Sequence, residues 1–154
     1  MLARQQPYLL SPGRICAILS RMDSNLTALY YRIGRENLAT LLRHFYADIR
    51  QHKLVGPIFN AQIEDWREHL ETIQSFWTRM TGGPSQYSGQ MPGKHLPLGL
   101  KLNHFQVWLQ LWEFNCRNYL ASAEAQEMIQ LAHHIGHRLK RIVGLNEYQF
   151  SILP

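Results

Sequence analysis

Apolar residues recur every three or four positions in several long stretches of this sequence, which is the spacing of one face of an α-helix. The first clear stretch covers residues 34–50, and its apolar positions are Leu38, Leu41, Leu42, Phe45, Tyr46 and Ile49. This helix is expected to stop near Pro57. A second helix is expected from near Ile63 to the stop at Gly82-Gly83-Pro84, with an inner face made of Trp66, His69, Leu70, Ile73, Phe76, Trp77 and Met80.

The middle of the chain has a different composition. Residues 81–101 are rich in glycine and proline, so we expect an extended loop with little more than one helical turn around residues 94–96. A helix returns from Asn103, a plausible N-cap, with apolar positions Phe105, Trp108, Leu109, Trp112, Cys116 and Tyr119. Ser122 opens a last amphipathic helix that Gly144 closes. No stretch alternates as a strand does, so the pattern predicts an all-α fold.

Composition narrows the class of protein. The chain has 154 residues and a formal net charge of +5 from scattered Lys and Arg, which indicates one soluble domain and no nucleic-acid partner. We expect a leader at 1–30, a folded domain at 31–145 and a tail at 146–154. Cys16 and Cys116 lie far apart without CxxC spacing, as is typical of the reduced cytoplasm. No stretch has the length and apolarity of a membrane span or signal peptide, so no membrane partner is expected.

Two features distinguish the chain from an ordinary helical bundle. The central loop is longer than the usual connection between bundle helices, which favours a functional segment. In addition, His69 and Tyr46 lie on otherwise apolar helix faces, where polar groups need partners. Together with a histidine in the loop, His95, these residues indicate a flat cofactor held between helical layers.

Four motifs then give a specific resemblance. FYADIR (45–50), GPIFNAQIEDWREHLETIQSFW (56–77), YSGQMPGKHLPL (87–98) and HFQVWLQLW (104–112) follow one another in the order and spacing of group III truncated hemoglobins. The likeness spans most of residues 36–120, and the last helix resembles the family only in its periodicity. It implies a truncated globin fold, in which a two-on-two helical sandwich surrounds heme b.

The resemblance also implies roles for individual residues. His95 matches the proximal ligand of the heme iron. The distal ligand pocket would contain Tyr46, His69 and Trp108. Other contacts with the cofactor would come from Phe59, Ile73 and Phe76, and from Tyr87 and Lys94 as partners of the heme propionates. Each has a plainer interpretation: His95 as a surface loop histidine, His69 as a core histidine with backbone partners, and the aromatic residues as packing.

The implied function is binding of oxygen or another diatomic ligand in a polar pocket suited to tight oxygen binding or redox detoxification. A second hypothesis is a nitric oxide dioxygenase or peroxidase, which would need a separate reductase because the chain has no flavin or nicotinamide domain. A third is a signalling module that has lost heme.

The motif HHxxH at His133, His134 and His137 could hold a metal, but it lacks the Glu of a metalloprotease, and we expect it to be a solvated face. The sequence leaves the oligomeric state open.

Overall fold

The computed structural model describes residues 27–145, and every regular element within that range is helical. The helices are α2 (Leu29–Ile33), α3 (Arg35–Gln51), α4 (Gly56–Gln62), α5 (Trp66–Met80), α6 (Met91–His95), the 3₁₀ turn η1 (Leu96–Leu98), α7 (Leu102–Tyr119) and α8 (Ser122–Ile142). The predicted all-α class is therefore confirmed. Residues 1–26 of the expected leader and the tail at 146–154 lie outside the described residues.

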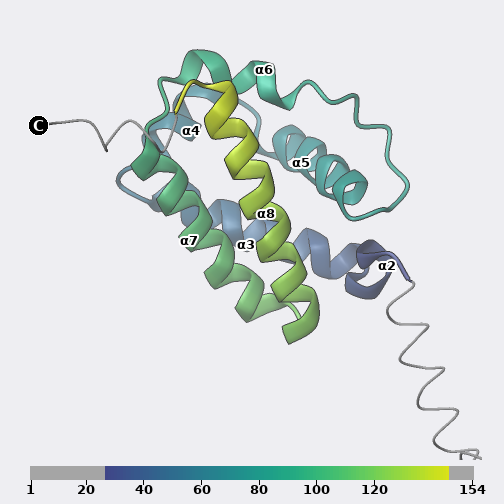
Figure 1. Ribbon diagram of the computed structural model, residues 1–154. Coiled ribbons are helices and arrows are strands. Elements are labelled where there is room, and N and C mark those ends of the chain that lie inside the picture. The colour runs from purple at the N-terminus through teal and green to yellow at the C-terminus, as the bar shows by residue number, and fades with distance from the viewer. Residues whose placement is uncertain (1–26, 146–154) are drawn as a thin grey trace, which may run out of the picture.

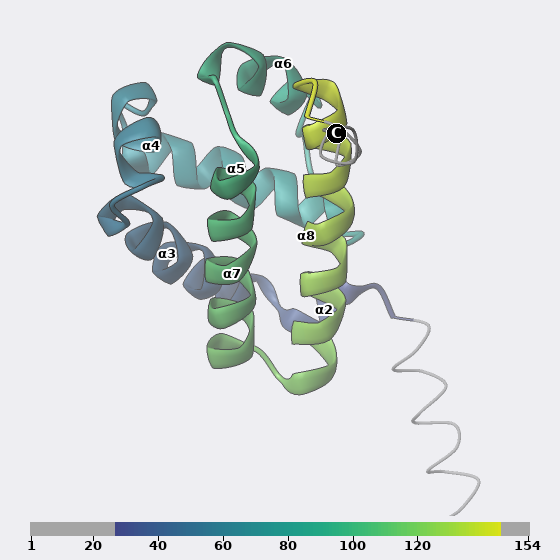
Figure 2. The same cartoon turned by 60° about the vertical axis from the view of Figure 1, so that its left-hand side comes forward.

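The helices form two crossed layers. In Figure 1 and Figure 2, α7 and α8 run side by side in opposite directions, and Figure 2 shows α3 and α5 crossing behind them. Helix α3 packs against α7 and α5, while the short α2 joins α3 to α8. Helix α6 lies at one end of the sandwich, where it contacts α8. This is the two-on-two arrangement that the resemblance implied.

The predicted helix faces account for most of the core. All six apolar positions of α3 are buried. Opposite them, Trp112 of α7 is fully buried, and its indole Nε1–H donates to the carbonyl of Met128 in α8 at 3.1 Å. Two residues near helix ends depart from the pattern: Met80 is 37% exposed, and Tyr119 is 38% exposed and stacks on His44. The inner-face prediction is wrong for these two, because each is the last residue of its helix.

Several helix boundaries differ from those predicted. Helix α3 ends at Gln51, and Pro57 instead lies in the first turn of α4, a helix the periodicity did not predict. Helix α5 begins at Trp66 because the Asp65 carboxylate accepts hydrogen bonds from the amides of Arg67 and Glu68. Helix α7 begins before Asn103, so Asn103 is not its N-cap. There the amide of Lys101 donates to Nδ1 of His104 at 3.0 Å.

A glycine pair fixes the turn after α5. Gly82 adopts φ 84°, a left-handed conformation that favours glycine. At Gly83 a Cβ would lie 2.5 Å from the ring of Tyr30, so only glycine lets α2 approach this closely. The amide of Tyr30 also donates to the carbonyl of Thr81 at 3.0 Å. The glycine pair therefore joins the start of the described chain to the end of α5.

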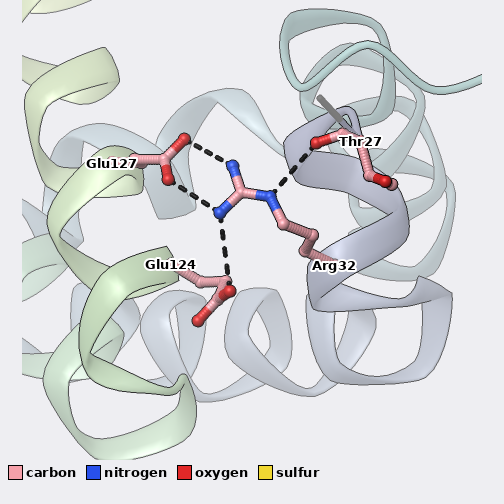
Figure 3. Close-up of polar contacts among 4 residues, drawn as sticks. All are labelled: Thr27, Arg32, Glu124 and Glu127. Atoms are coloured by element: carbon pink, nitrogen blue, oxygen red, sulfur yellow. Dashed lines mark hydrogen bonds and ion pairs between the residues drawn. The ribbon is translucent and has the colours of Figure 1, made fainter. Parts of the chain in front are cut away.

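An ion-pair cluster closes the other side of α2 (Figure 3). The guanidinium of Arg32 donates two hydrogen bonds to the carboxylate of Glu127, at 2.7 and 2.6 Å, and a longer one to Glu124 at 3.5 Å. Its Nε–H donates to the carbonyl of Thr27 at 3.2 Å. The hydrogen bond from Arg32 holds the pKa of the Glu127 carboxyl below its ordinary value. The cluster links α2 to α8 through a two-pronged, charge-assisted contact.

None of the helices in residues 27–145 is long and apolar enough to cross a membrane.

The Arg32 cluster predicts a pH-dependent contribution to stability. We expect Arg32→Met to lower the free energy of unfolding by about 1 kcal/mol at neutral pH, because the two-pronged contact is only partly exposed. Since the folded-state pKa of Glu127 is lowered, this contribution is present above the ordinary pKa of Glu and disappears as pH falls through the lowered value. Arg117→Met is the control, because its pair with Glu113 lies within one helix and is exposed. Urea unfolding at several pH values measures the difference; equal losses in both variants would contradict the prediction.

Candidate functional site

His95 ends the short helix α6 in a defined orientation. Its Nδ1 lies 2.7 Å from the carbonyl oxygen of Met91, one turn earlier. Because a carbonyl oxygen only accepts, Nδ1–H is the donor of this bond, which leaves Nε2 as the nitrogen that can offer a lone pair. This is the tautomer that binds a metal through Nε2, with the second nitrogen held by a backbone carbonyl. His134 makes the same bond to Gln130 on α8, at 2.9 Å, but it lies on the exposed surface.

The loop before α6 is fastened to α5 at two points. The hydroxyl of Ser85 donates to the carbonyl of Ser75 at 2.6 Å and accepts from the amide of Tyr87 at 3.2 Å. The guanidinium of Arg79 donates to the carbonyl of Tyr87 at 2.5 Å. A glycine- and proline-rich loop could otherwise take many paths, and these bonds select one of them.

Tyr87 connects this anchored loop to α6. Its ring packs edge-on against Phe76 of α5, with centroids 5.3 Å apart. Burial raises the pKa of its phenol, and a hydrogen bond from the backbone amide of Met91 acts in the opposite direction. Tyr87 therefore packs the anchored loop against α5 shortly before Met91, the residue whose carbonyl orients His95.

Tyr46 is the centre of an aromatic cluster on the other side of the site. It is 5% exposed, and its ring lies 6.1 Å from Phe59, 6.1 Å from Trp66 and 5.5 Å from the imidazole of His69. Burial raises the pKa of the Tyr46 hydroxyl, which therefore stays protonated and available as a donor. The cluster combines residues from α3, α4 and α5.

Two buried side-chain atoms in the described part of the chain lack a hydrogen-bond partner, Oδ1 of Asn115 and Nε2 of His69, and only the second belongs to the aromatic cluster. The pKa of His69 is lowered, first by burial and then by the charges of Lys94 and His95 on α6. His69 and His95, on different helices, are thus within electrostatic range of each other. A buried nitrogen without a partner costs about 1–3 kcal/mol, and such groups call for an explanation such as a ligand.

Trp108 of α7 belongs to a neighbouring part of the cluster. The indole is half-buried, and its ring centroid lies 5.6 Å from that of Phe45, the residue before Tyr46, and 5.8 Å from that of Trp112. Among the other predicted cofactor contacts, Phe76 is buried, Phe59 and Ile73 pack half-buried against the core, and Lys94 is exposed on α6.

Four residues of the site were not predicted to act there. Ser85 and Arg79 anchor the loop, and the Met91 carbonyl orients His95; no pattern in the sequence marks such tertiary bonds. Trp66 was predicted only as an inner-face residue. Its ring centroid lies 5.6 Å from that of His69, and the guanidinium of Arg50 lies 4.5 Å above its ring.

Within the described residues no group of three or more His, Cys, Asp or Glu side chains could hold a metal ion. The HHxxH histidines are exposed, as predicted for a solvated face.

Comparison with known proteins identifies the family of this chain. The family model for bacterial-like globins matches residues 28–141. The chain belongs to the bacterial-like globins. Among curated relatives of this globin, the group 3 truncated hemoglobin ctb of Campylobacter jejuni is 41% identical over 86 residues, which cover 53% of this chain and 68% of the relative. The group 2 truncated hemoglobin YjbI of Bacillus subtilis is 30% identical over 93 residues, 57% of this chain and 68% of that protein.

A solved structure of a truncated hemoglobin has the same fold. The crystal structure of the group III truncated hemoglobin from Campylobacter jejuni superimposes with a TM-score of 0.70 at 32% identity, covering 77% of this chain and 96% of that one. The globin is therefore a truncated hemoglobin, and its identity to the group 3 relative exceeds its identity to the group 2 relative.

The anchoring of the loop gives a test that needs no cofactor. In Ser85→Ala the Tyr87 amide loses its acceptor, so we expect its hydrogen exchange to accelerate by about tenfold, the effect of one hydrogen bond of roughly 1.4 kcal/mol. Exchange of the peptide spanning residues 83–90, followed by mass spectrometry, measures this. Ser88→Ala, a change at an exposed serine of the same loop, is the matched control. Identical exchange in both variants would show that Ser85 does not hold the loop.

Proposed function

We propose that this truncated hemoglobin binds heme through Nε2 of His95 and receives oxygen or another diatomic ligand beside Tyr46, His69 and Trp108. The observation that carries the proposal is the buried, partnerless Nε2 of His69, which lies within electrostatic range of a second histidine whose Nε2 has its lone pair free. A ligand group between the two histidines would explain both. No CxxCH motif is present for covalent attachment, so the residues fit noncovalent heme b.

When bound, heme supplies an iron that can take one protein nitrogen and one further ligand. The chain contributes the surroundings. His95 is the nitrogen donor, and its hydrogen bond to Met91 keeps the ring in one tautomer and orientation. Phe59, Ile73 and Phe76 supply apolar contacts that exclude water. Lys94 could pair with a propionate carboxylate, and the Tyr87 hydroxyl could donate its O–H to one.

The distal residues would act on the ligand by hydrogen bonding. The Tyr46 hydroxyl, the Trp108 indole N–H and the His69 imidazole could each donate a hydrogen bond to a diatomic ligand that carries partial negative charge. Because burial keeps Tyr46 protonated, its donor stays present at neutral and moderately alkaline pH. Such a pocket favours slow oxygen release and is better suited to retention, sensing or redox detoxification than to transport.

The alternative activities make different demands. A nitric oxide dioxygenase or peroxidase would use the same pocket but needs electrons from a separate reductase. The partnerless His69 nitrogen argues against a module that has lost heme, since nothing would then compensate for its burial. The cytoplasm stays the expected compartment.

The heme ligand is tested by His95→Ala. We expect the wild-type chain to show a Soret band after heme addition, and His95→Ala to bind heme weakly or not at all. His134→Ala is the matched control, because His134 makes the same bond to a backbone carbonyl but lies on the exposed face of α8. Circular dichroism confirms folding of each variant. Unchanged heme affinity in His95→Ala would refute the ligand assignment, and a wild-type chain without a Soret band would favour the heme-free alternative.

The distal donor is tested by Tyr46→Phe, which removes one hydroxyl and keeps the buried ring. A hydrogen bond to a charged or partly charged acceptor contributes roughly 1.5–3 kcal/mol, so the oxygen dissociation rate should rise by about ten- to a hundredfold. Carbon monoxide is a poorer acceptor, and its release should change much less. Flash photolysis and stopped-flow measure both rates, and the double variant Tyr46→Phe/Trp108→Phe reveals any replacement of the bond by Trp108. Equal acceleration of both ligands would indicate a steric effect instead.

A further inference from the structure

A buried amide joins the two helices that carry Tyr46 and Trp108. Among the buried residues of α7, Asn115 is the only one with an amide side chain, and it is 1% exposed. Its Nδ2 group donates to Oδ2 of Asp48 on α3 at 2.8 Å and to the carbonyl of Leu111, one turn earlier on α7, at 2.9 Å. Within residues 27–145, the bond to Asp48 is the one hydrogen bond between α3 and α7.

This bond leaves the other end of the amide unsatisfied. Oδ1 of Asn115 is buried and has no hydrogen-bond partner in the described part of the chain. The opposite orientation of the amide would place Oδ1 against the Asp48 carboxylate, and two acceptors repel, so Asp48 determines the orientation. A leucine has nearly the same shape and would fill the space without an unsatisfied oxygen. Asn115 therefore costs stability, and what it adds is a directional contact.

The directional contact supplies what the apolar contacts between α3 and α7 lack. Phe45 of α3 packs edge-on against both Trp108 and Trp112, which lie one turn apart on α7, with centroids 5.6 and 4.9 Å away. Apolar surfaces of this kind tolerate small shifts along the helix axis. A hydrogen bond is broken when its atoms move apart by about 1 Å, and a buried amide fixes the register of paired helices in this way. The bond between Asp48 and Asn115 therefore sets the position of α7 along α3.

The position of α7 along α3 also decides how the two distal donors are spaced. Tyr46 lies two residues before Asp48 on α3, and Trp108 lies two turns before Asn115 on α7. Because Trp108 and Asn115 belong to one continuous helix, a shift of α7 at Asn115 also moves the Trp108 indole. Two donors on different helices can serve one small ligand only if the distance between them is held closely.

We propose that Asp48 and Asn115 are positioning residues for the distal pocket. Their hydrogen bond sets the register of α3 against α7, so that the Tyr46 hydroxyl and the Trp108 indole N–H converge on one diatomic ligand. This inference rests on the proposed function. Neither residue belongs to the aromatic cluster around Tyr46, and both act through the donors that their helices carry. Retention of the ligand thus depends on a polar pair outside the pocket.

The test is Asn115→Leu in the full chain, with Asn118→Leu, the same change at an exposed position of α7, as the matched control. Nitrogen-15 labelling of tryptophan reports the Trp108 indole N–H by nuclear magnetic resonance, before heme addition and in the carbon monoxide complex; Trp108→Phe identifies the signal. We expect Asn115→Leu to keep or raise the unfolding midpoint and to split or broaden this signal. Oxygen release should accelerate about three- to tenfold and carbon monoxide release by less than about twofold. Asn118→Leu should match the wild type.

Variants of the half-buried Asp48 keep the test open if Asn115→Leu does not fold. Asp48→Ala should change the Trp108 signal and oxygen release in the same way, whereas Asp48→Asn, which keeps an acceptor for Asn115, should restore wild-type values. A folded Asn115→Leu or Asp48→Ala with either readout unchanged would overturn the proposal, because the pair would then only stabilise the fold. Asp48→Asn behaving like Asp48→Ala would overturn it too. A wild-type chain without a Soret band would instead refute the proposed function, while the Trp108 signal before heme addition still tests the register.

Discussion

The hydrogen bond from His95 to the carbonyl of Met91 is the contact on which the site depends, because it decides which nitrogen of the ring is free. That contact lies within a five-residue helix, which is too short to be stable on its own. Helix α6 keeps its position because Ser85, Arg79 and Tyr87 tie the preceding loop to α5. Since α5 also carries His69, one helix positions both sides of the site.

This arrangement has an energetic cost that the rest of the fold must offset. A buried imidazole nitrogen without a partner is unfavourable, and the loop that carries His95 contributes few buried side chains. The compensation comes from the opposite part of the molecule, where α3, α7 and α8 bury apolar faces and the Trp112 indole is fully hydrogen-bonded. Helices α3 and α7 therefore serve both purposes, because they bury the apolar core and also carry Tyr46 and Trp108 at the edge of the candidate site.

Periodicity predicted the long helices well, because a face that must be buried along several turns leaves its spacing in the sequence. It also marked His69 and Tyr46, since a polar group on such a face is conspicuous. Helix α4 has only seven residues, too few for a periodic signal, although it carries Phe59. The start of α7 was predicted too late in the chain, because the Lys101 amide donates to Nδ1 of His104 and Asn103 does not act as the N-cap. Anchoring by Ser85 and Arg79 depends on the path of the folded chain and has no local pattern.

The electrostatics of the site constrain what His69 can do. Burial, Lys94 and His95 all lower its pKa, so His69 is neutral at neutral pH and stays neutral until the solution is more acidic than an ordinary histidine requires. A neutral ring can donate from Nε2 or offer a lone pair there, but not both. With the proton on Nε2 it supports the same ligand as Tyr46; with the lone pair on Nε2 it would compete with that ligand for the metal. The tautomer of His69 therefore decides whether the ring donates a hydrogen bond to the ligand or offers its own nitrogen to the metal. Acid protonates both nitrogens, so at low pH His69 can only donate.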